Sequence, residues 1–287
     1  MERKWTERHR LQALGRESAD LLLKNCKLVN VLSGEIEDGI DIAIGGDRIV
    51  GVGHGYEAAH VIDCTGLYVH PGLIDAHIHV AGELMTVFHA AKRMSQSGTT
   101  AVITDPHEIT NVAGLAGFMF QSECARLNRY IDVYFTAPSC VPTLNDLSVE
   151  TPGAKLDSET LALLANMPSV VGLGEMMNVP GVLDGDAEVI EKIDRFLSVG
   201  KVVDGHAPGL SGHALNAYIA SGISSDHEST VLEEAREKLR RGMYVMIREG
   251  TSEHNLEALL PLIDKNGRNI ARDIHHFAQA DDTWHIG

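Results

Sequence analysis

Cysteine is scarce in this sequence, and the four residues present form no CxxC pair: Cys26, Cys64, Cys124 and Cys140. Cysteines scattered in this way are typical of free, mostly buried thiols in a reducing cytoplasm. Long apolar runs are missing as well, since no stretch of about 18 apolar residues exists to cross a membrane. The first twenty residues are charged and have no apolar core, so we expect no signal peptide there. These absences predict a cytoplasmic protein with no membrane partner.

Positive charge is also in short supply. Lys and Arg total 24 against 40 Asp and Glu, which gives a formal net charge of -16 with neutral histidines. Binding to nucleic acids depends on Lys and Arg that neutralise phosphates, so we expect no nucleic-acid partner. The hydrophobic fraction of 44% and the charged fraction of 22% are those of a soluble globular protein.

The sequence pattern changes near residue 67. Residues 1–20 are polar and weakly amphipathic, which predicts a helix, and residues 21–53 contain β-rich runs broken by Gly and Asp. Such short spacing predicts antiparallel strands and turns. We therefore expect residues 1–67 to form an N-terminal helix and a small, partial β subdomain, and residues 68–287 to form a separate domain.

From Tyr68 onward, short apolar runs alternate with longer segments of helical period, which predicts βα units and a parallel sheet. The expected strands are 68–80, 99–108, 132–142, 170–177, 202–209, 223–228 and 244–250, and the expected helices include 86–97, 186–199 and 230–241. Seven such repeats with polar strand ends predict an α/β fold, a TIM-type (β/α)8 barrel. A doubly wound sheet is the alternative, but no GxGxxG motif follows the first strand. Residues 269–277 make a poor eighth strand, so we expect the barrel to be incomplete there.

Nearly every expected strand ends in a residue able to bind a metal. The carboxyl ends of barrel strands meet at one mouth, and His77 and His79, two apart on one strand, face the same side. Imidazoles with a carboxylate suit Zn, Fe or Mn, and a bridging carboxylate suits two divalent ions. Each of these residues alone could be structural, and only their repetition in successive units favours a metal site. The predicted ligands are His77, His79, Glu175, His206 and His227.

Other polar residues lie at the same strand ends. His107, with Asp105, either reaches the site as a ligand or substrate contact or stabilises its own loop. Asp204 is expected to orient His206. Asp226 either orients His227 or caps the next helix, and Glu228 either contacts substrate or water in catalysis or is an exposed helix-start glutamate. The remaining histidines considered are expected to be solvated: His54, His60, His89, His213, His254 and His285.

The predicted site limits the chemistry to hydrolysis. Two divalent ions lower the pKa of a bridging water, so that hydroxide exists at neutral pH. A carboxylate at the barrel mouth then carries its proton to the leaving group. The expected reaction is attack at a carbonyl or at an amidine-like ring carbon.

Several long motifs resemble those of a known family. The segment PGLIDAHIH, residues 71–79, resembles the amidohydrolase superfamily in general. Four further segments resemble adenine deaminases in particular: APSCVP (137–142), GLGEMMNVPGVLDGD (172–186), DGHAPGLSGHALNAYIASGISSDHE (204–228) and MYVMIREG (243–250). The similarity runs from about Asp20 to Ile263.

The resemblance implies a metal-dependent aminohydrolase that converts adenine to hypoxanthine and ammonia, with a small purine base as its partner. It implies the same five ligands, with Glu175 in the place of the carboxylated lysine of dihydroorotase-like relatives. The family uses iron, manganese or zinc, and we expect two divalent ions, Mn or Fe before Zn. A related cyclic-amide or imidazolone hydrolase is the second enzyme hypothesis, although those usually have a strand-four lysine or lack GEMM (174–177).

Three departures from the family pattern affect this expectation. VAGELM, residues 80–85, replaces an acidic-serine motif. Arg272 stands at the place of the family's strand-eight metal-binding Asp, and Asp273, the expected acid/base, is one residue on, where a strand side chain faces the other way. The family also continues for a comparable length, so we expect a truncated chain. A non-catalytic remnant is the hypothesis from another class, and the exposed edges of an open barrel predict a homo-oligomer.

Overall fold

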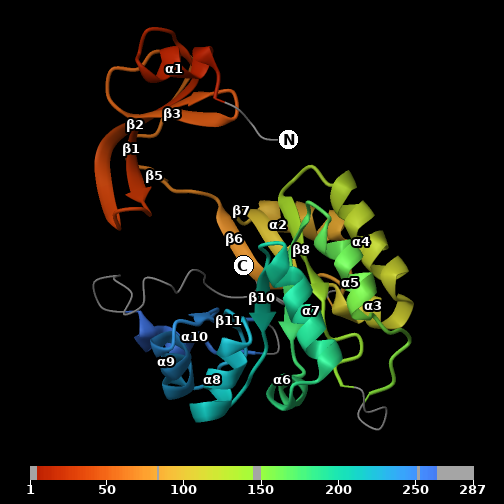
Figure 1. The fold of residues 1–287 in the computed structure, drawn as a ribbon. Coiled ribbons are helices and arrows are strands. Elements are labelled where there is room, and N and C mark those ends of the chain that lie inside the picture. Colours follow the sequence, from red (N-terminus) through yellow and green to blue (C-terminus); the bar gives the residue numbers. More distant parts are fainter. Residues whose placement is uncertain (1–4, 83, 145–149, 251–252, 264–287) are drawn as a thin grey trace. The chain divides into compact units, whose positions relative to one another are not determined.

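A computed structural model is the structure of this chain, and it describes residues 5–82, 84–144, 150–250 and 253–263 (Figure 1). The chain forms two compact units, Met1–Pro71 and Gly72–Gly287, and each is considered by itself. Over the described ranges, no helix has the length and apolar character needed to cross a membrane.

From residue 5 onward, the first unit contains one short helix and a sheet. Helix α1 (Glu7–Ala13) begins after Thr6, whose side chain accepts a hydrogen bond from the N–H of His9 in a capping box. The strands are β1 (Ala19–Asn30), β2 (Glu35–Gly45), β3 (Arg48–Gly53), β4 (Ala58–Asp63) and β5 (Tyr68–Val69). The prediction of a helix up to residue 20 is wrong beyond α1, because Gly15 takes a φ of +65° and β1 already pairs with β4 at Ala19.

The sheet of the first unit has the order β3-β2-β1-β4, and β5 also pairs with β1. The predicted antiparallel pairing holds for β1, β2 and β3, whereas β4 and β5 run parallel to β1. Parallel strands need a crossover, which the connection through β2 and β3 supplies. Two small hydrophobic clusters are buried in this unit. One consists of Ala19, Leu22, Ala43 and Val50, and the other of Cys26, Ile42 and Cys64.

The described part of the second unit contains seven strands that all run parallel to their neighbours. They are β6 (Leu73–Ile78), β7 (Thr99–Thr104), β8 (Asp132–Pro138), β9 (Val170–Met176), β10 (Val202–Gly205), β11 (Ser225–Asp226) and β12 (Tyr244–Val245). The first five form one sheet in chain order, a parallel bridge joins Val203 to Ile223, and β11 pairs with β12. A doubly wound sheet would reverse its strand order at a switch point. Continuous chain order is that of a TIM-type fold.

The sequence pattern predicts one strand over residues 68–80, and this prediction is wrong, because the structure has two separate strands there. Tyr68–Val69 pairs with β1 of the first unit, and β6 begins only at Leu73. The interruption follows from His70 and Pro71, because proline lacks the N–H needed for a ladder. The predicted eighth strand, 269–277, lies outside the described residues.

Helices connect the strands of the second unit and pack on its sheet. They are α2 (Val87–Ser95), α3 (His107–Ala113), α4 (Leu115–Leu127), α5 (Ser158–Ala165), α6 (Val179–Asp184), α7 (Ala187–Ser198), α8 (Gly212–Ala220), α9 (Leu232–Arg240) and α10 (Leu256–Leu259), followed by the short helix η1 (Leu260–Leu262). In α7, Val189, Ile193 and Phe196 recur at helical spacing and are buried. Helices α2, α5 and α7 contact β7, β8, β9 and β10 (Figure 1), so the helices leave the carboxyl ends of the strands free to carry a site.

Candidate metal centre

Five residues predicted as ligands lie together in the second unit. His77 lies in β6 with His79 directly after it, and Glu175 lies in β9. His206 and His227 each follow the last residue of their strands, β10 and β11. Because parallel strands present their carboxyl ends at one edge, the five side chains converge there. His77, Glu175 and His227 are no more than 2% exposed.

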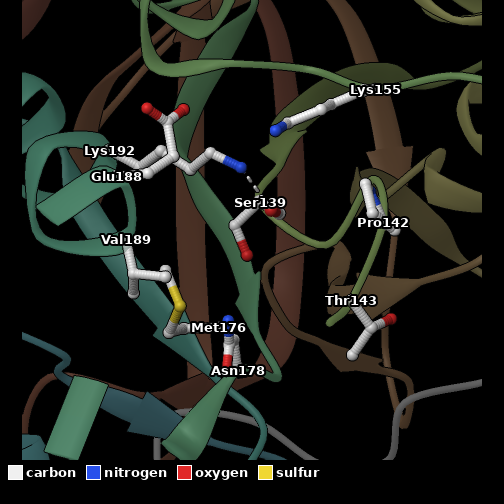
Figure 2. A pocket seen from close by; sticks show the side chains of 9 residues that line it. All are labelled: Ser139, Pro142, Thr143, Lys155, Met176, Asn178, Glu188, Val189 and Lys192. Carbon is white, nitrogen blue, oxygen red and sulfur yellow. Dashed lines mark hydrogen bonds between the residues drawn. The ribbon is translucent and has the colours of Figure 1, made fainter. Parts of the chain in front are cut away.

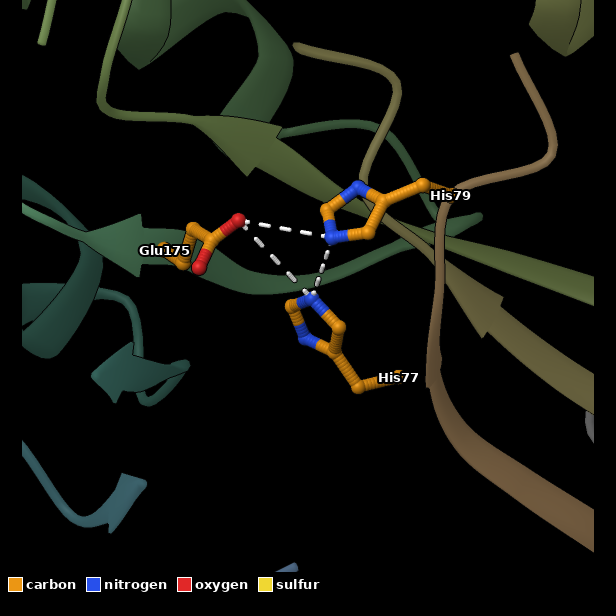
Figure 3. A group of neighbouring side chains, drawn as sticks. All are labelled: His77, His79 and Glu175. Carbon is orange, nitrogen blue, oxygen red and sulfur yellow. Dashed lines mark hydrogen bonds and ion pairs between the residues drawn. The ribbon is translucent and has the colours of Figure 1, made fainter. Parts of the chain in front are cut away.

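Glu175 is at the centre of this cluster, and its two carboxylate oxygens face different pairs of imidazoles. Oε1 is 3.4 Å from Nε2 of His79 and 4.0 Å from Nε2 of His77 (Figure 3). Oε2 is 2.8 Å from Nε2 of His227 and is also bonded to Nδ1 of His206. These atoms form two candidate metal-binding groups that share Glu175. A carboxylate in this position is suited to bridge two cations.

The donor atoms of His77 and His79 suit a cation better than they suit each other. Nδ1 of His77 is 2.7 Å from Oδ2 of Asp204, and Nδ1 of His79 is 3.0 Å from the backbone oxygen of Asp105. Protons on both Nδ1 atoms satisfy these acceptors and leave a lone pair on each Nε2. The two Nε2 atoms lie 3.0 Å apart and face the Glu175 carboxylate. Such a buried set of acceptors repels itself unless a cation lies among them, and its donor types suit Zn, Fe or Mn.

Burial and neighbouring charges set the protonation of the cluster. The pKa of His79 is lowered to about 3, because burial and then the charge of His77 disfavour the cationic ring. Burial alone would raise the pKa of Glu175, but the charge of His227 and hydrogen bonds from His206 and His227 outweigh it, and that pKa lies well below its usual value. His79 is therefore neutral and Glu175 ionised, which are the forms in which these two side chains bind metal ions.

Asp204 contacts the rings of His77 and His227, whereas the sequence predicts that it orients His206. Its Oδ2 is 2.7 Å from Nδ1 of His77 and 3.6 Å from Nδ1 of His227. Strand β10 ends one residue before His206, so the side-chain alternation on which the prediction depends does not extend to that residue. The hydroxyl of Ser225 donates to the other oxygen of Asp204 at 2.6 Å and keeps the carboxylate in place.

His107 and Asp105, at the end of β7, approach the cluster beside Glu175. Nδ1 of His107 is 3.4 Å from Oε1 of Glu175 and 3.4 Å from Oδ1 of Asp105. Both carboxylate oxygens of Asp105 are buried without a hydrogen bond to the described residues. Together with His107 and Glu175, Asp105 forms a further candidate metal-binding group. The structure thus brings Asp105 and His107 to the site, and their positions fit both a metal ligand and a substrate contact.

Glu108 is a residue of this cluster that the sequence prediction misses. Its Oε1 is 3.3 Å from Nδ1 of His79 and 3.9 Å from Nε2 of His107. Burial raises its pKa to about 7, against the opposing charge of His107. Its side chain also lines an open cavity of about 430 Å³ whose other walls include Met85 and Phe120. The sequence feature that could have identified Glu108 is its position directly after His107, in the polar segment that follows β7.

Glu228 lies beside His206 and His227. Its Oε1 is 3.8 Å from Nδ1 of His206 and 3.9 Å from Nε2 of His227, and it forms an ion pair with Arg248. The Glu228 side chain is only 14% exposed, and α9 begins four residues later, so the alternative of an exposed helix-start glutamate is wrong. Asp273, the other residue predicted for proton transfer, lies outside the described residues.

Asp226 follows neither of the alternatives that its position suggests. Helix α9 begins only at Leu232, with Val231 as its cap residue. The Asp226 carboxylate instead accepts hydrogen bonds from the N–H of Ala207 and the hydroxyl of Ser229, both at 2.8 Å. It therefore joins the loops after β10 and β11 rather than orienting a ring.

Tyr218 of α8 also supports the site and is missed by the sequence prediction. Its hydroxyl accepts a hydrogen bond from the N–H of His206 at 3.1 Å and donates one to the carbonyl of Met176 at 2.5 Å. The side chain is fully buried. No local pattern identifies it, because its two partners are 12 and 42 residues away in sequence.

A small cavity of about 20 Å³ lies next to the backbone of β9 (Figure 2). The Ser139 hydroxyl donates to the carbonyl of Glu175 at 2.5 Å, and Nζ of Lys192 donates to the carbonyl of Ser139 at 3.2 Å. The volume suits about one water molecule, so this cavity is too small for an organic substrate. Its polar walls hold the backbone of Glu175 in place.

A parallel TIM-type sheet with imidazoles and carboxylates gathered at its carboxyl edge is typical of barrel proteins with a site at the strand ends, and here that site is a candidate metal centre. Within that class, the chain belongs to the amidohydrolase family, which it matches over residues 68–282.

Curated relatives of this chain include adenine deaminases. One from Dehalococcoides mccartyi is 47% identical over 88% of this chain and 43% of the relative, and one from Clostridium acetobutylicum is 46% identical over 90% and 45%. Adenine deaminase 2 of Carboxydothermus hydrogenoformans is 45% identical over 88% and 43%. The chain therefore spans less than half the length of these relatives.

Solved structures with a similar fold include two hydantoinases. The L-hydantoinase of Arthrobacter aurescens is 18% identical with a TM-score of 0.57, over 80% of this chain and 58% of that protein. The D-hydantoinase of Bacillus sp. AR9 is 18% identical with a TM-score of 0.56, over 80% and 57%. At this identity the likeness supports the TIM-type fold alone.

Proposed function

We propose that the second unit binds two divalent metal ions through the five predicted ligands. The observation that carries this proposal is Glu175, which turns one oxygen toward each pair of imidazoles. Manganese or iron is proposed ahead of zinc, on the resemblance to adenine deaminases. When bound, such ions supply a water-derived nucleophile at neutral pH and stabilise the negative charge that develops during hydrolysis.

The reaction that we propose is the deamination of adenine to hypoxanthine and ammonia. Relatives named adenine deaminase are 45% to 47% identical over about nine-tenths of this chain. The hydantoinases share only the fold, at 18% identity, so the cyclic-amide hydrolase hypothesis has the weaker support. The substrate under this proposal is a small purine base.

The side chains of this chain divide the proposed chemistry between them. Asp204 and the carbonyl of Asp105 hold the Nδ1 protons of His77 and His79, so that both Nε2 atoms face Glu175. Glu228 is held beside the cluster by Arg248, and we assign it to accept a proton from the attacking water and pass it to the departing ammonia. Asp273, the acid/base expected from the sequence, stays a prediction.

Activity and metal content of the 287-residue chain together test this proposal. After loading with Mn²⁺ or Fe²⁺, we expect two ions per chain and the release of hypoxanthine and ammonia from adenine. Glu175→Gln should lose both ions and the activity, because the shared ligand loses its charge. Glu159→Gln, an exposed change on α5, should keep both.

Two results would overturn the proposal. Two bound ions without turnover of adenine would replace deamination by the non-catalytic alternative, and one or no ion would remove the metal centre itself. A parallel assay with hydantoins separates adenine from cyclic amides.

We further propose a cytoplasmic homo-oligomer with an N-terminal helix and partial β subdomain, predicted as residues 1–67, and a metal-dependent barrel, predicted as residues 68–287. Because Tyr68–Val69 pairs with β1, we place the boundary after Pro71. The cysteine pattern and the sheet edges support these assignments. Sedimentation of the metal-loaded chain measures the oligomeric state directly.

A further inference from the structure

Helix α9 carries a lysine that is buried behind the metal centre. Lys238 has 0% exposure, and its Nζ lies 2.8 Å from Oδ2 of Asp226 and 2.8 Å from Oε1 of Glu234. The same ammonium donates to the carbonyl of Ala207 at 2.8 Å and to the hydroxyl of Ser229 at 3.0 Å. A buried ammonium is tolerated only when its charge and its protons are matched in this way.

Two of the four partners of Lys238 are immediate sequence neighbours of proposed ligands. Ala207 follows His206, and Asp226 precedes His227. Ala207 is held on both sides, since its N–H donates to Oδ1 of Asp226 at 2.8 Å and its carbonyl accepts from Lys238. One side chain thus fixes the backbone beside both His206 and His227.

Other residues of α9 hold the rest of the loop that follows His206. Glu234 accepts a hydrogen bond from the N–H of Gly209 at 2.7 Å, and Glu237 accepts one from the N–H of Gly212 at 2.9 Å. The loop has little regular structure of its own between β10 and α8, and these contacts with α9 add to its internal hydrogen bond from the Leu210 N–H to the Ala207 carbonyl.

His77 and His79 are held by different groups. Their Nδ1 atoms bond to Asp204 and to the carbonyl of Asp105, as described above. Among the described residues, Lys238 bonds to Ala207, Asp226, Ser229 and Glu234, and to none of the groups that hold His77 and His79. Asp204 also lies 3.6 Å from Nδ1 of His227, so it reaches both halves of the centre, whereas Lys238 bonds only to groups beside His206 and His227 and within α9.

We propose that Lys238 is a positioning residue for the half of the metal centre formed by His206 and His227. This inference rests on the proposed metal centre. Loss of the ammonium leaves the Ala207 carbonyl with only the longer hydrogen bond from the Leu210 N–H, at 3.3 Å, and leaves the Asp226 charge unmatched in a buried site. Both loops then shift, and the ion between His206, His227 and Glu175 is held less tightly, while the ion at His77 and His79 is retained.

Metal stoichiometry and Co²⁺ absorption of two variants test the inference. Lys238→Met removes the ammonium, and Lys238→Met combined with Asp226→Asn removes both charges while an amide oxygen still accepts the Ala207 N–H. We expect the second ion to bind about 10-fold to 100-fold more weakly in both, as for other groups that orient ligands. The visible spectrum should lose the contribution of one Co²⁺ ion.

Lys201→Met is the matched control. Nζ of Lys201 also donates to backbone carbonyls, those of Met167 and Val170, but at the amino end of β9. This variant should keep two ions and an unchanged Co²⁺ spectrum. If Lys238→Met fails to fold, the charge-balanced double variant provides the result.

The outcomes separate this inference from the metal centre on which it rests. Wild-type chain with fewer than two ions would overturn both. If the wild-type chain and both Lys238 variants bind two ions with equal affinity and give equal spectra, the metal centre stands and only the proposed role of Lys238 is overturned.

Discussion

Glu175 combines two demands that are hard to meet in one residue. It is 2% exposed, and a buried carboxylate is costly unless positive charge or hydrogen bonds surround it. His206 and His227 supply both at Oε2, through their hydrogen bonds and the charge of His227, while Oε1 faces the Nε2 atoms of His77 and His79. The same surroundings that make the charge tolerable also suit it to hold cations.

Tyr218 offers a test of the support around the site. Tyr218→Phe removes the hydroxyl that accepts from the His206 N–H and donates to the Met176 carbonyl. Two buried backbone groups lose a partner, so the free energy of unfolding should fall by about 1–3 kcal/mol. Urea denaturation measures this, and metal binding at His206 should weaken in parallel. Tyr130→Phe, at an exposed tyrosine, should change stability by about 0.5 kcal/mol or less; equal effects of the two variants would contradict the role of Tyr218.

Cys140 predicts a pH effect on stability. Burial raises the pKa of its thiol to about 12, above the usual value of 9.0. Above pH 9 the unfolded chain therefore loses a proton that the folded chain keeps, and stability should decrease as the pH rises from about 9 to 12. Denaturation of the metal-free chain at pH 8 and pH 10 measures the decrease, and Cys140→Ala should remove this part of it. An unchanged slope in the variant would assign the effect to other groups.

The residues of the site differ in how far sequence could predict them. His77, Glu175, His206 and His227 were identifiable because strand-end positions recur in each βα unit. Glu108, Tyr218 and Lys238 were not, because each acts through contacts with segments that are distant in sequence or through burial. Asp204 was assigned to the wrong ring for the same reason: its partner, His77, is 127 residues away.

At the scale of the strands, glycine allows β9 to bring Glu175 close to its neighbours. A Cβ on Gly174 would lie 2.4 Å from Oγ1 of Thr136 and 2.7 Å from Oδ2 of Asp105. No real Cβ approaches other atoms so closely, so a larger residue at 174 would push β9 away from β8. Steric contact with Thr136 and Asp105 therefore explains why a glycine precedes Glu175.

Gly174→Ala tests this close approach. We expect the variant to lose about 1–3 kcal/mol of stability through overpacking and to bind metal more weakly, because β9 carries Glu175. Denaturant midpoints and metal titration measure the two effects. Gly185→Asn, at a helix end with φ +72° and open space around it, is the control, since asparagine tolerates that conformation. If Gly174→Ala has the stability and metal affinity of the wild type, β8 and β9 can move apart without loss of free energy, and the steric argument is wrong.

At the scale of the whole molecule, metal binding should stabilise one unit and not the other. Every candidate metal-binding group among the described residues lies in the second unit. At a free metal concentration 100 times the dissociation constant, each ion adds about 2.7 kcal/mol to the stability of the unit that binds it. Calorimetry with and without chelator, with hydrogen exchange of β9 and β1 peptides, should show protection in β9 alone. Equal protection in β1 would contradict the assignment.

Local order in the sequence was sufficient for the class of fold and for the main ligands. Apolar runs alternating with helical segments predict parallel βα units, and those units place their strand ends at one edge whatever fills the core. Two features of the first unit depended on the folded chain, namely the pairing of Tyr68–Val69 with β1 and the parallel direction of β4. The folded chain also determined which groups Asp204, Asp226 and Lys238 contact. These are contacts between residues far apart in sequence, whose free energy comes from burial and hydrogen bonding that exist only after the segments have come together.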